Sequence, residues 1–174
     1  MRNKLRLILP TKKYLNSFAL GIKESRPENA QPFNSHFRIF KTKKDFPVYI
    51  KKMTDDRQGV NLDPGHVPQT IYWAMAGEKF VGILKLRHRL WPENIASHIG
   101  YAVVPSERKK GYATEMLRLG LKKAKKLGIK NIIVSCEVSN IPSRKVIERN
   151  HGVLNKKIRS KNTQDKLMFC ISNK

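Results

Sequence analysis

The stretch Tyr101-Ala-Val-Val-Pro-Ser-Glu-Arg-Lys-Lys-Gly-Tyr-Ala113 is the strongest indication of the fold of this chain. It begins as an apolar strand, stops at Pro105, crosses a basic turn and enters an amphipathic helix expected over residues 111–126. Gly111 and Ala113 let a ligand approach the backbone closely, and the unpaired N–H groups at a helix start carry partial positive charge. The stretch therefore predicts a strand, an anion-binding turn and a helix.

Three consecutive cations in the turn, Arg108, Lys109 and Lys110, favour a pyrophosphate as its ligand. Each charge-assisted hydrogen bond to such a group contributes roughly 1.5–3 kcal/mol. The turn is neither a Walker loop nor a dinucleotide-binding fingerprint, because the spacings G-x-x-x-x-G-K-[ST] and G-x-G-x-x-G are absent. A basic turn that only caps a helix is the alternative to a ligand-binding turn.

Length and composition predict one domain without covalent or metal support. A chain of 174 residues can bury roughly 70% of its unfolded surface in one core. Cys136 and Cys170 are too few for a disulfide framework and lack metal-ligand spacing, so we expect reduced cysteines, no metal and a cytoplasmic location. The apolar run at residues 5–9 is too short for a signal peptide, and no stretch is long enough to span a membrane.

The net charge is +23, from 36 Lys and Arg against 13 Asp and Glu. Such a charge favours polyanionic partners, and an electrostatic contact with nucleic acid is one expectation. The basic residues are spread along the chain, however, and no aromatic RNA-binding motif accompanies them. A lysine-rich composition of the whole proteome explains the charge equally well.

Periodicity and turn residues predict seven strands and four helices. Strands are expected over residues 5–9, 70–76, 79–87, 97–104, 131–138, 153–158 and 166–172, and helices over residues 12–24, 42–59, 111–126 and 140–150. We expect Thr11 to cap the first helix, Gly128 to end the third, and residues 26–32, 60–69 and 88–96 to form loops. No linker divides the chain, so residues 1–174 are predicted to be a single domain.

Two motifs and the order of elements resemble the GCN5-related N-acetyltransferase (GNAT) family. Arg108-Lys-Lys-Gly-Tyr-Ala113 matches its R/Q-x-x-G-x-G/A signature, and NIPSRKVIERNHG at residues 140–152 resembles the segment N-x-x-[AS]-x-x-[LV]-[YI]-E-[KR]-x-x-G that follows its fifth strand. Arg87-His-Arg89 and His98-Ile-Gly-Tyr101 look like an uncharacterised bacterial branch. The resemblance implies an α/β (α+β) acyl-CoA N-acyltransferase fold. Its central sheet is mixed and mostly antiparallel, with about seven strands flanked by helices and with splayed central strands.

The same resemblance implies an acetyl-CoA-dependent N-acetyltransferase, with residues 70–174 as the coenzyme-binding core and residues 1–69 as the helical, acceptor side. The pantetheine arm would lie between the strands ending at Val104 and Val138, where the amide of Val103, or of a neighbouring residue, polarises the thioester carbonyl. Asn140 and Ser143 would touch the coenzyme from the other side, although both residue types also favour helix starts. The implied coenzyme-binding residues are Tyr101, Ala102, Val103, Val104, Arg108, Lys109, Lys110, Gly111, Tyr112, Ala113, Thr114, Asn140 and Ser143.

The expected reaction is direct attack of a neutral primary amine on the acetyl carbon of acetyl-CoA in a ternary complex. A base that takes the ammonium proton would accelerate it by about 10²–10⁴-fold. His98, which has a suitable intrinsic pKa, and Glu137 are candidate bases. Glu93 is a third candidate, and a water relay is the alternative to all of them.

The usual general acid is missing from the sequence. Many GNAT members place a tyrosine where the aligned segment of this chain has Ile147. Tyr112 and Tyr101 are the substitutes that the sequence offers, unless the thiolate leaves without being protonated.

The acceptor is expected to be a small-molecule or peptide amine. The sequence is compatible with a monomer and with a homodimer. The loops at residues 61–69 and 88–96, with the N-terminal helices, would line the acceptor's pocket. The positive field disfavours a strongly cationic amine and permits an anionic one. The competing hypothesis is a basic protein that binds RNA or the ribosome on an inactive acyltransferase scaffold. A third hypothesis combines the two: the basic surface recruits a protein or ribosomal acceptor, whose amine is then acetylated.

Overall fold

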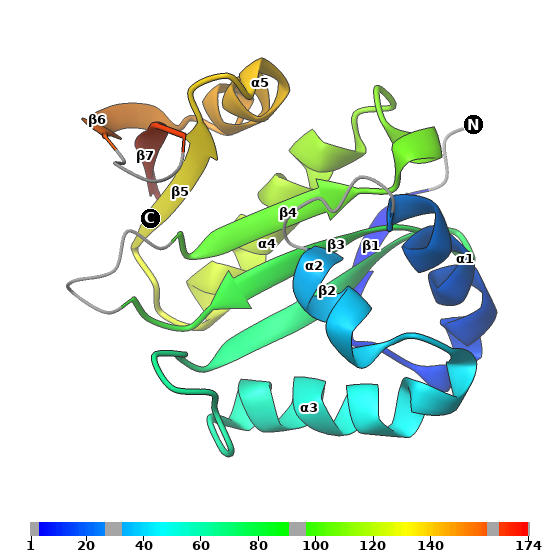
Figure 1. Ribbon diagram of the computed structural model, residues 1–174. Coiled ribbons are helices and arrows are strands. Elements are labelled where there is room, and N and C mark those ends of the chain that lie inside the picture. Colours follow the sequence, from blue (N-terminus) through cyan, green and yellow to red (C-terminus); the bar gives the residue numbers. More distant parts are fainter. Residues whose placement is uncertain (1–3, 27–32, 91–96, 160–163, 174) are drawn as a thin grey trace.

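The computed structural model describes residues 4–26, 33–90, 97–159 and 164–173. Figure 1 shows its strands and helices. The strands are β1 (Leu5–Ile8), β2 (Gln69–Ala76), β3 (Lys79–Arg87), β4 (Ile99–Val103), β5 (Asn131–Glu137), β6 (Val153–Ile158) and β7 (Lys166–Ser172). The α-helices are α1 (Leu15–Ser25), α2 (Phe33–Ile39), α3 (Phe46–Gln58), α4 (Tyr112–Lys126) and α5 (Ile141–Arg149). Short 3-10 turns lie at Lys12–Tyr14, Lys43–Asp45 and Pro105–Glu107.

The first sheet is antiparallel, with strand order β1-β2-β3-β4. β2 and β3 form the predicted hairpin, in which Ala76 pairs with Lys79 and Gly77 takes a left-handed φ of 62°. Side chains alternate between the two faces along β3, so that Leu84 and Leu86 point to one face and Ile83 and Lys85 to the other. This alternation divides the hydrophobic interior into two clusters.

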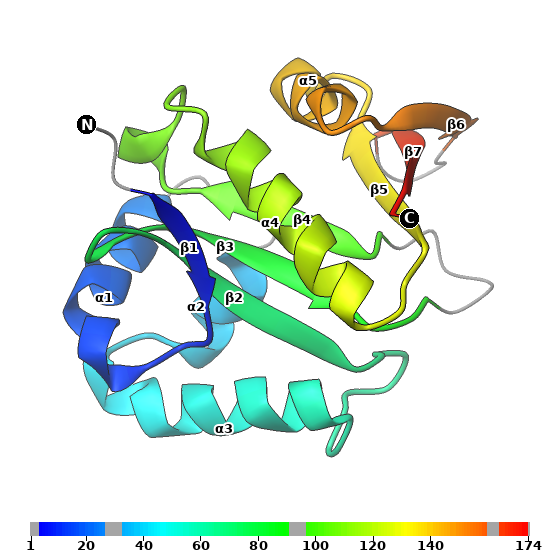
Figure 2. The same ribbon diagram turned by 180° about the vertical axis from the view of Figure 1, so that it is seen from behind.

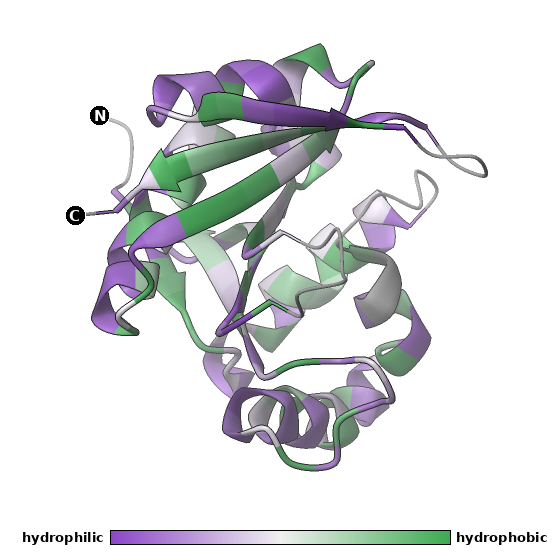
Figure 3. Ribbon diagram, turned by 90° about the vertical axis from the view of Figure 1, so that its left-hand side faces the viewer, coloured by the Kyte–Doolittle hydropathy of each residue, from purple (hydrophilic) through white to green (hydrophobic). Residues whose placement is uncertain are grey.

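The second sheet is antiparallel and smaller, with strand order β5-β7-β6. Figure 3 shows that β5 and β7 are mainly hydrophobic, whereas β6, at the edge, is largely hydrophilic. The side chains of β6 are exposed along most of its length, including Val153 at 70% and Leu154 at 50%. The seven strands therefore form two hydrogen-bonded sheets.

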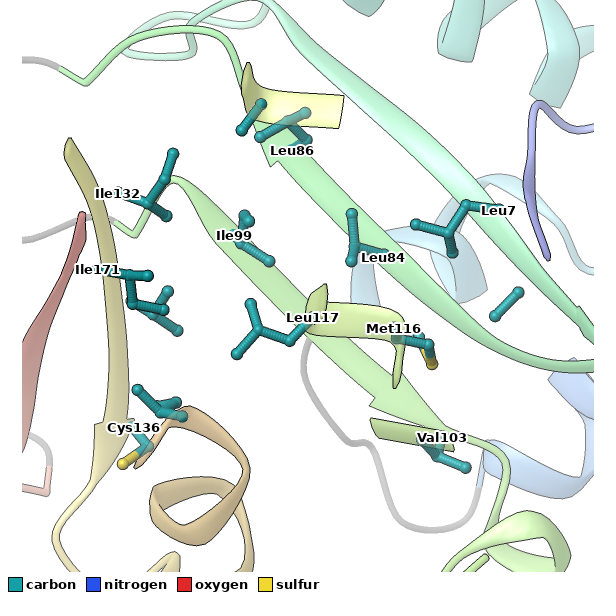
Figure 4. Packing of buried hydrophobic residues seen from close by; sticks show 14 of the residues in the cluster. Leu7, Leu84, Leu86, Ile99, Val103, Met116, Leu117, Ile132, Cys136 and Ile171 are labelled. Atoms are coloured by element: carbon teal, nitrogen blue, oxygen red, sulfur yellow. The ribbon is translucent and has the colours of Figure 1, made fainter. Parts of the chain in front are cut away.

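Helices cover both faces of the first sheet. Figures 1 and 2 show α1, α2 and α3 on one face and α4 on the opposite face, with α5 beside the second sheet. The cluster under α4 is mostly aliphatic and continues from Leu84 and Leu117 across to Ile132 and Ile171 in the second sheet (Figure 4). The cluster under α1–α3 is rich in aromatic rings, among them Phe18 stacked on Trp73 with ring centroids 4.1 Å apart. No helix within the described residues combines the length and the apolar composition needed to cross a bilayer.

The two sheets meet at β4 and β5, which start side by side and diverge toward their ends (Figure 1). At the start of the divergence, His98 N–H donates to Ile133 O at 2.8 Å. Beyond this point the two strands belong to different sheets. The expected splaying of the central strands and the acyl-CoA N-acyltransferase fold are confirmed, but in place of one mixed sheet the described strands form two antiparallel sheets.

The structure corrects the prediction at the N-terminal helices. The segment Phe33–Ile39, for which no helix was predicted, forms α2. Thr11 makes no capping hydrogen bond, and the first three predicted helical residues, Lys12–Tyr14, form a 3-10 turn. Most of the predicted loop at residues 26–32 and the candidate base Glu93 lie outside the described residues. Gly128 adopts a left-handed φ of 74° just after α4, as expected for a residue that ends a helix.

Candidate active site

The basic turn is held in a conformation that exposes backbone N–H groups at the start of α4. Gly111 precedes the helix with φ 79°, and Lys109 also has a left-handed φ of 60°. No side chain of the described residues caps this helix start, and the helical hydrogen bonds begin with Glu115 N–H to Gly111 O at 3.2 Å. The preceding amides at the helix start are therefore available to an anion, with the positive end of the helix dipole beside them.

Glu107, which the sequence analysis did not single out, fixes the base of this turn. Its carboxylate is 3% exposed and receives Lys79 Nζ on one oxygen and Lys110 Nζ, at 3.1 Å, on the other. Burial alone would raise the pKa of Glu107, but the bonds from the two lysines lower it below its usual value. Glu107 thus ties the turn to the first residue of β3, and its bond to Lys110 lies within the turn itself.

The remaining cations of the turn face solvent. Arg108 and Lys109 are exposed, and Arg108 Nε donates to Val103 O at 3.3 Å. The guanidinium group of Arg108 is therefore held at the end of β4, where the strand meets the turn. The structure brings together the predicted pyrophosphate-binding residues Arg108, Lys109, Lys110 and Gly111.

Hydrogen bonding in β4 divides the predicted pantetheine-binding residues into two sets. Val104 N–H donates to Val81 O at 2.9 Å, so this amide is not available to a coenzyme. Because antiparallel strands alternate their hydrogen bonds, Ala102 also faces β3, whereas Tyr101 and Val103 direct their backbone groups to the β5 side. We therefore correct the predicted backbone set by removing Ala102 and Val104 from it.

Polar side chains join β4 and β5 where their divergence begins. Ser97 Oγ bonds Ser135 Oγ at 2.6 Å and accepts Ser135 N–H at 2.9 Å. His98 Nδ1 accepts Ile133 N–H at 3.0 Å. These bonds satisfy amides of β5 that a regular strand neighbour would have satisfied, and the sequence offered no signal for this pairing.

The hydrogen bond at Nδ1 restricts the chemistry of His98. A neutral imidazole that accepts at Nδ1 carries its proton on Nε2, so the other ring nitrogen is a donor. Burial and, to a smaller extent, the charge of Arg87 lower the pKa of His98 and favour this neutral form. The geometry therefore argues against His98 as the general base and assigns it to the strand junction.

Glu137 is the last residue of β5, whereas His98 contacts Ile133, the third residue of this strand. The side chain of Glu137 is exposed at the last position of the strand. Four residues separate Ile133 from Glu137, which corresponds to roughly 13 Å of extended strand. The two candidate bases therefore occupy different ends of the β4/β5 junction.

Tyr101 crosses from β4 to α5. Its hydroxyl lies 2.9 Å from Ser143 Oγ and 3.3 Å from Ser143 O. Burial raises the pKa of Tyr101, which keeps the phenol protonated at neutral pH. Tyr101 therefore places a proton donor one helical turn before Ile147, the buried residue at the position of the missing family tyrosine.

The other predicted residues on this side have structural partners. Asn140 Oδ1 accepts Ser143 N–H at 3.0 Å and caps α5, so the capping role considered for Asn140 is confirmed. Thr114 O accepts a hydrogen bond from Asn150 Nδ2 at 3.2 Å, and Asn150 thereby links α4 to α5. Tyr112 and Ala113 pack at the edge of the aliphatic cluster, at the turn end of α4.

Comparison with known proteins identifies the family. The model of the acetyltransferase (GNAT) domain matches residues 14–153, which is most of the chain. The chain therefore belongs to the GNAT family, and acetyl-CoA-dependent acyl transfer is its class of reaction. None of the curated proteins matches the sequence.

Solved structures share the fold at low sequence identity. RimL, a ribosomal L7/L12 alpha-N-protein acetyltransferase in complex with coenzyme A, is 16% identical, with a TM-score of 0.71 over 97% of this chain and 93% of that chain. RimJ from Mycobacterium smegmatis in complex with CoA-disulfide is 14% identical, with a TM-score of 0.72 over 97% of this chain and 81% of that chain. The microcin C7 self-immunity acetyltransferase MccE in complex with acetyl-CoA and AMP is 17% identical, with a TM-score of 0.69 over 97% and 92%.

Proposed function

We propose that this protein transfers the acetyl group of acetyl-CoA to a primary amine by direct attack in a ternary complex. The observation that carries the proposal is the divergence of β4 from β5, which leads to a basic turn with available amides. An extended pantetheine arm matches the outward backbone groups of Tyr101 and Val103, and a pyrophosphate matches the turn. The family membership supports the same arrangement.

The residues divide the work between binding and chemistry. Arg108, Lys109 and the amides at the start of α4 would hold the pyrophosphate, with Glu107 keeping the turn in place. The N–H of Val103 would stabilise the oxyanion that forms on the thioester carbonyl. Tyr101 would donate a proton or a hydrogen bond to the departing sulfur. Because His98 is a donor at its free nitrogen, water is the proposed route for the ammonium proton.

Calorimetric titration of coenzyme A and acetyl-CoA at moderate salt tests the cofactor site. Gly111→Asp places a carboxylate beside the bound pyrophosphate and should weaken binding at least 100-fold. Gly128→Asp is the matched control, because it adds the same charge at a left-handed glycine of similar φ, 74° against 79°, at the far end of α4. Equal coenzyme affinity in the two folded variants, or no binding to the unaltered protein, would refute the proposal.

A protein amine is a specific acceptor worth testing, because RimL is described as acetylating a ribosomal protein. The net charge of +23 would attract a polyanionic complex such as the ribosome. Mass spectrometry of ribosomal fractions incubated with acetyl-CoA should then show a new acetylated amine. Ribosome binding without acetylation, lost steeply as salt rises, would instead support the inactive scaffold.

A further inference from the structure

A chain of buried polar groups crosses the aromatic cluster on the α1–α3 face. Trp73 Nε1 donates to Tyr49 Oη at 3.2 Å, and Tyr49 Oη lies 3.1 Å from His36 Nδ1. All three side chains are at most 1% exposed. Such a chain in an apolar interior is costly unless each donor has an acceptor, so the direction of each bond matters.

The direction of these hydrogen bonds follows from Trp73, because an indole N–H can only donate. If Tyr49 O–H donates to His36 Nδ1, every polar atom of the chain is paired except His36 Nε2, which then carries a proton. If His36 Nδ1 donates instead, both the Tyr49 proton and Nε2 are left unpaired, which is less favourable. This series of hydrogen-bonded side chains therefore ends at His36 Nε2, an N–H donor that has no hydrogen-bond partner among the described residues.

Lys85 carries a positive charge that acts on this imidazole. Its charge contributes, after burial, to lowering the pKa of His36 to about 3, which keeps the imidazole neutral. Burial, followed by the charge of Arg87, lowers the pKa of Lys85 itself to about 8. No carboxylate among the described residues forms an ion pair with Lys85. The charge of Asp56 opposes this lowering of the pKa of Lys85, but Asp56 forms its ion pair with Lys52, with Oδ1 3.0 Å from Nζ, and accepts a hydrogen bond from Gln69 on Oδ2.

The neighbouring position on β4 leaves room beside Lys85. Lys85 pairs across the strands with Gly100, and both belong to the face covered by α1–α3. No atom of the described residues lies within 4 Å of a Cβ built on Gly100, so these residues leave space beside this glycine. Gly100 directly precedes Tyr101, where the proposed thioester site begins. Lys85 and this space thus lie three positions along β4 from Val103, the proposed oxyanion-binding residue.

We infer that Lys85 and His36 Nε2–H bind an oxyanion group, a carboxylate or a phosphate, carried by the acceptor close to its amine. The inference rests on the proposed function, because it gives the open space at Gly100 to the acceptor. Arg87, held by its bond to Ser97 O at 2.7 Å, adds positive charge on the same face. An anion there would supply a partner for the histidine and neutralise a half-buried cation.

Anion binding can be measured without catalysis. Inorganic phosphate and acetate are titrated separately into the full chain saturated with coenzyme A, and the side-chain nitrogens of His36 are followed by NMR. We expect saturable binding that shifts Nε2, weakened at least tenfold by Lys85→Met and retained by Lys85→Arg. Lys126→Met, which removes an exposed charge from α4 on the opposite face, should change affinity less than twofold. Absence of saturable binding, or equal binding to Lys85→Met, would overturn the inference.

Matched amines then identify the source of the anion. Glycine is compared with glycinamide for a carboxylate, and phosphoethanolamine with ethanolamine for a phosphate, by the rate of coenzyme A release. One charged member should react at least tenfold faster than its neutral partner, and Lys85→Met should abolish that preference. An equal loss of rate for charged and neutral amines would make Lys85 a general base and refute the inference, while acetyl transfer itself would stand. Anion binding without acetylation of any amine would instead count against the proposed function.

Discussion

The two faces of the first sheet are covered by side chains of different kinds. Under α4 the contacts are aliphatic and continue into the second sheet (Figure 4). Under α1–α3, aromatic rings surround a polar chain that runs from Trp73 through Tyr49 to His36 and ends near Lys85. Apolar packing is not directional and does not select one partner. A buried polar network with one unpaired donor, here His36 Nε2–H, requires an acceptor at a defined position. We therefore expect the α4 face to contribute mainly stability, and we propose that the α1–α3 face contributes selectivity for the acceptor.

The largest expected effect is on the aliphatic face. Leu117 is fully buried between α4 and the sheet, so Leu117→Ala should leave a cavity and lower the free energy of unfolding by about 2–5 kcal/mol. Urea denaturation measures this change. Leu20→Ala, at a side chain that is 71% exposed, is the control and should stay within about 0.5 kcal/mol. A small loss in Leu117→Ala would mean that this face is not the main source of stability.

The opposite sign is expected for a cation on the polar face. The pKa of Lys85 falls from 10.5 to about 8 on folding, so holding its proton costs about 3 kcal/mol at pH 7. Lys85→Met should therefore raise the stability at pH 7 by up to about this amount. Because the unfolded chain binds the proton more tightly, the unaltered protein gains stability as pH rises from about 8 to 10.5, and the difference shrinks there. If denaturation experiments show a difference in the free energy of unfolding between Lys85→Met and the unaltered protein that stays constant from about pH 8 to 10.5, the prediction is wrong.

An intermediate loss is expected inside the polar chain. Tyr49→Phe removes the hydroxyl that accepts from Trp73 and donates to His36, so two buried nitrogens lose their partner. The free energy of unfolding should fall by about 1–3 kcal/mol. Thermal unfolding together with the side-chain NMR signals of His36 tests this. If the stability and the His36 tautomer are both unchanged, Tyr49 does not donate its hydroxyl proton to His36 Nδ1 as proposed.

The smallest effect is expected outside both faces, at the start of α5. Asn140→Ala removes the cap on Ser143 N–H and should cost about 1 kcal/mol, whereas Asn140→Asp should keep the cap. Coenzyme affinity, measured in parallel by calorimetry, distinguishes capping from contact. If Asn140→Asp preserves stability but weakens coenzyme binding, the residue also touches the coenzyme. If neither variant changes affinity, its role is confined to the helix.

The fold was predictable because its signals are local. The strand, basic turn and helix around Gly111, and the hairpin at Gly77, follow from neighbouring residues in the sequence. The position of the basic turn was predictable for the same reason. Helix α2 was not predicted, because its short segment Phe33–Ile39 owes its structure to packing of Phe33 and Phe37 in the aromatic cluster.

The partners within the site depend on contacts between distant positions. Lys79 and Glu107 are 28 residues apart, and Ser97 and Ser135 are 38 apart, so no spacing rule connects them. The same holds for the bond between His98 and Ile133, which turned a candidate base into a structural residue. Residue types alone identified candidate groups, but hydrogen-bond direction decided which of their atoms are free.

The junction between the two sheets combines sparse hydrogen bonds with continuous apolar packing. Within a sheet, sliding one strand along another breaks a row of directional bonds, whereas the aliphatic cluster that spans the junction has no directional requirement. A small change in the angle between the sheets should therefore cost little free energy. The junction between β4 and β5 can then widen or narrow while the protein stays folded. A molecule inserted along this junction would act as a spacer that sets its width.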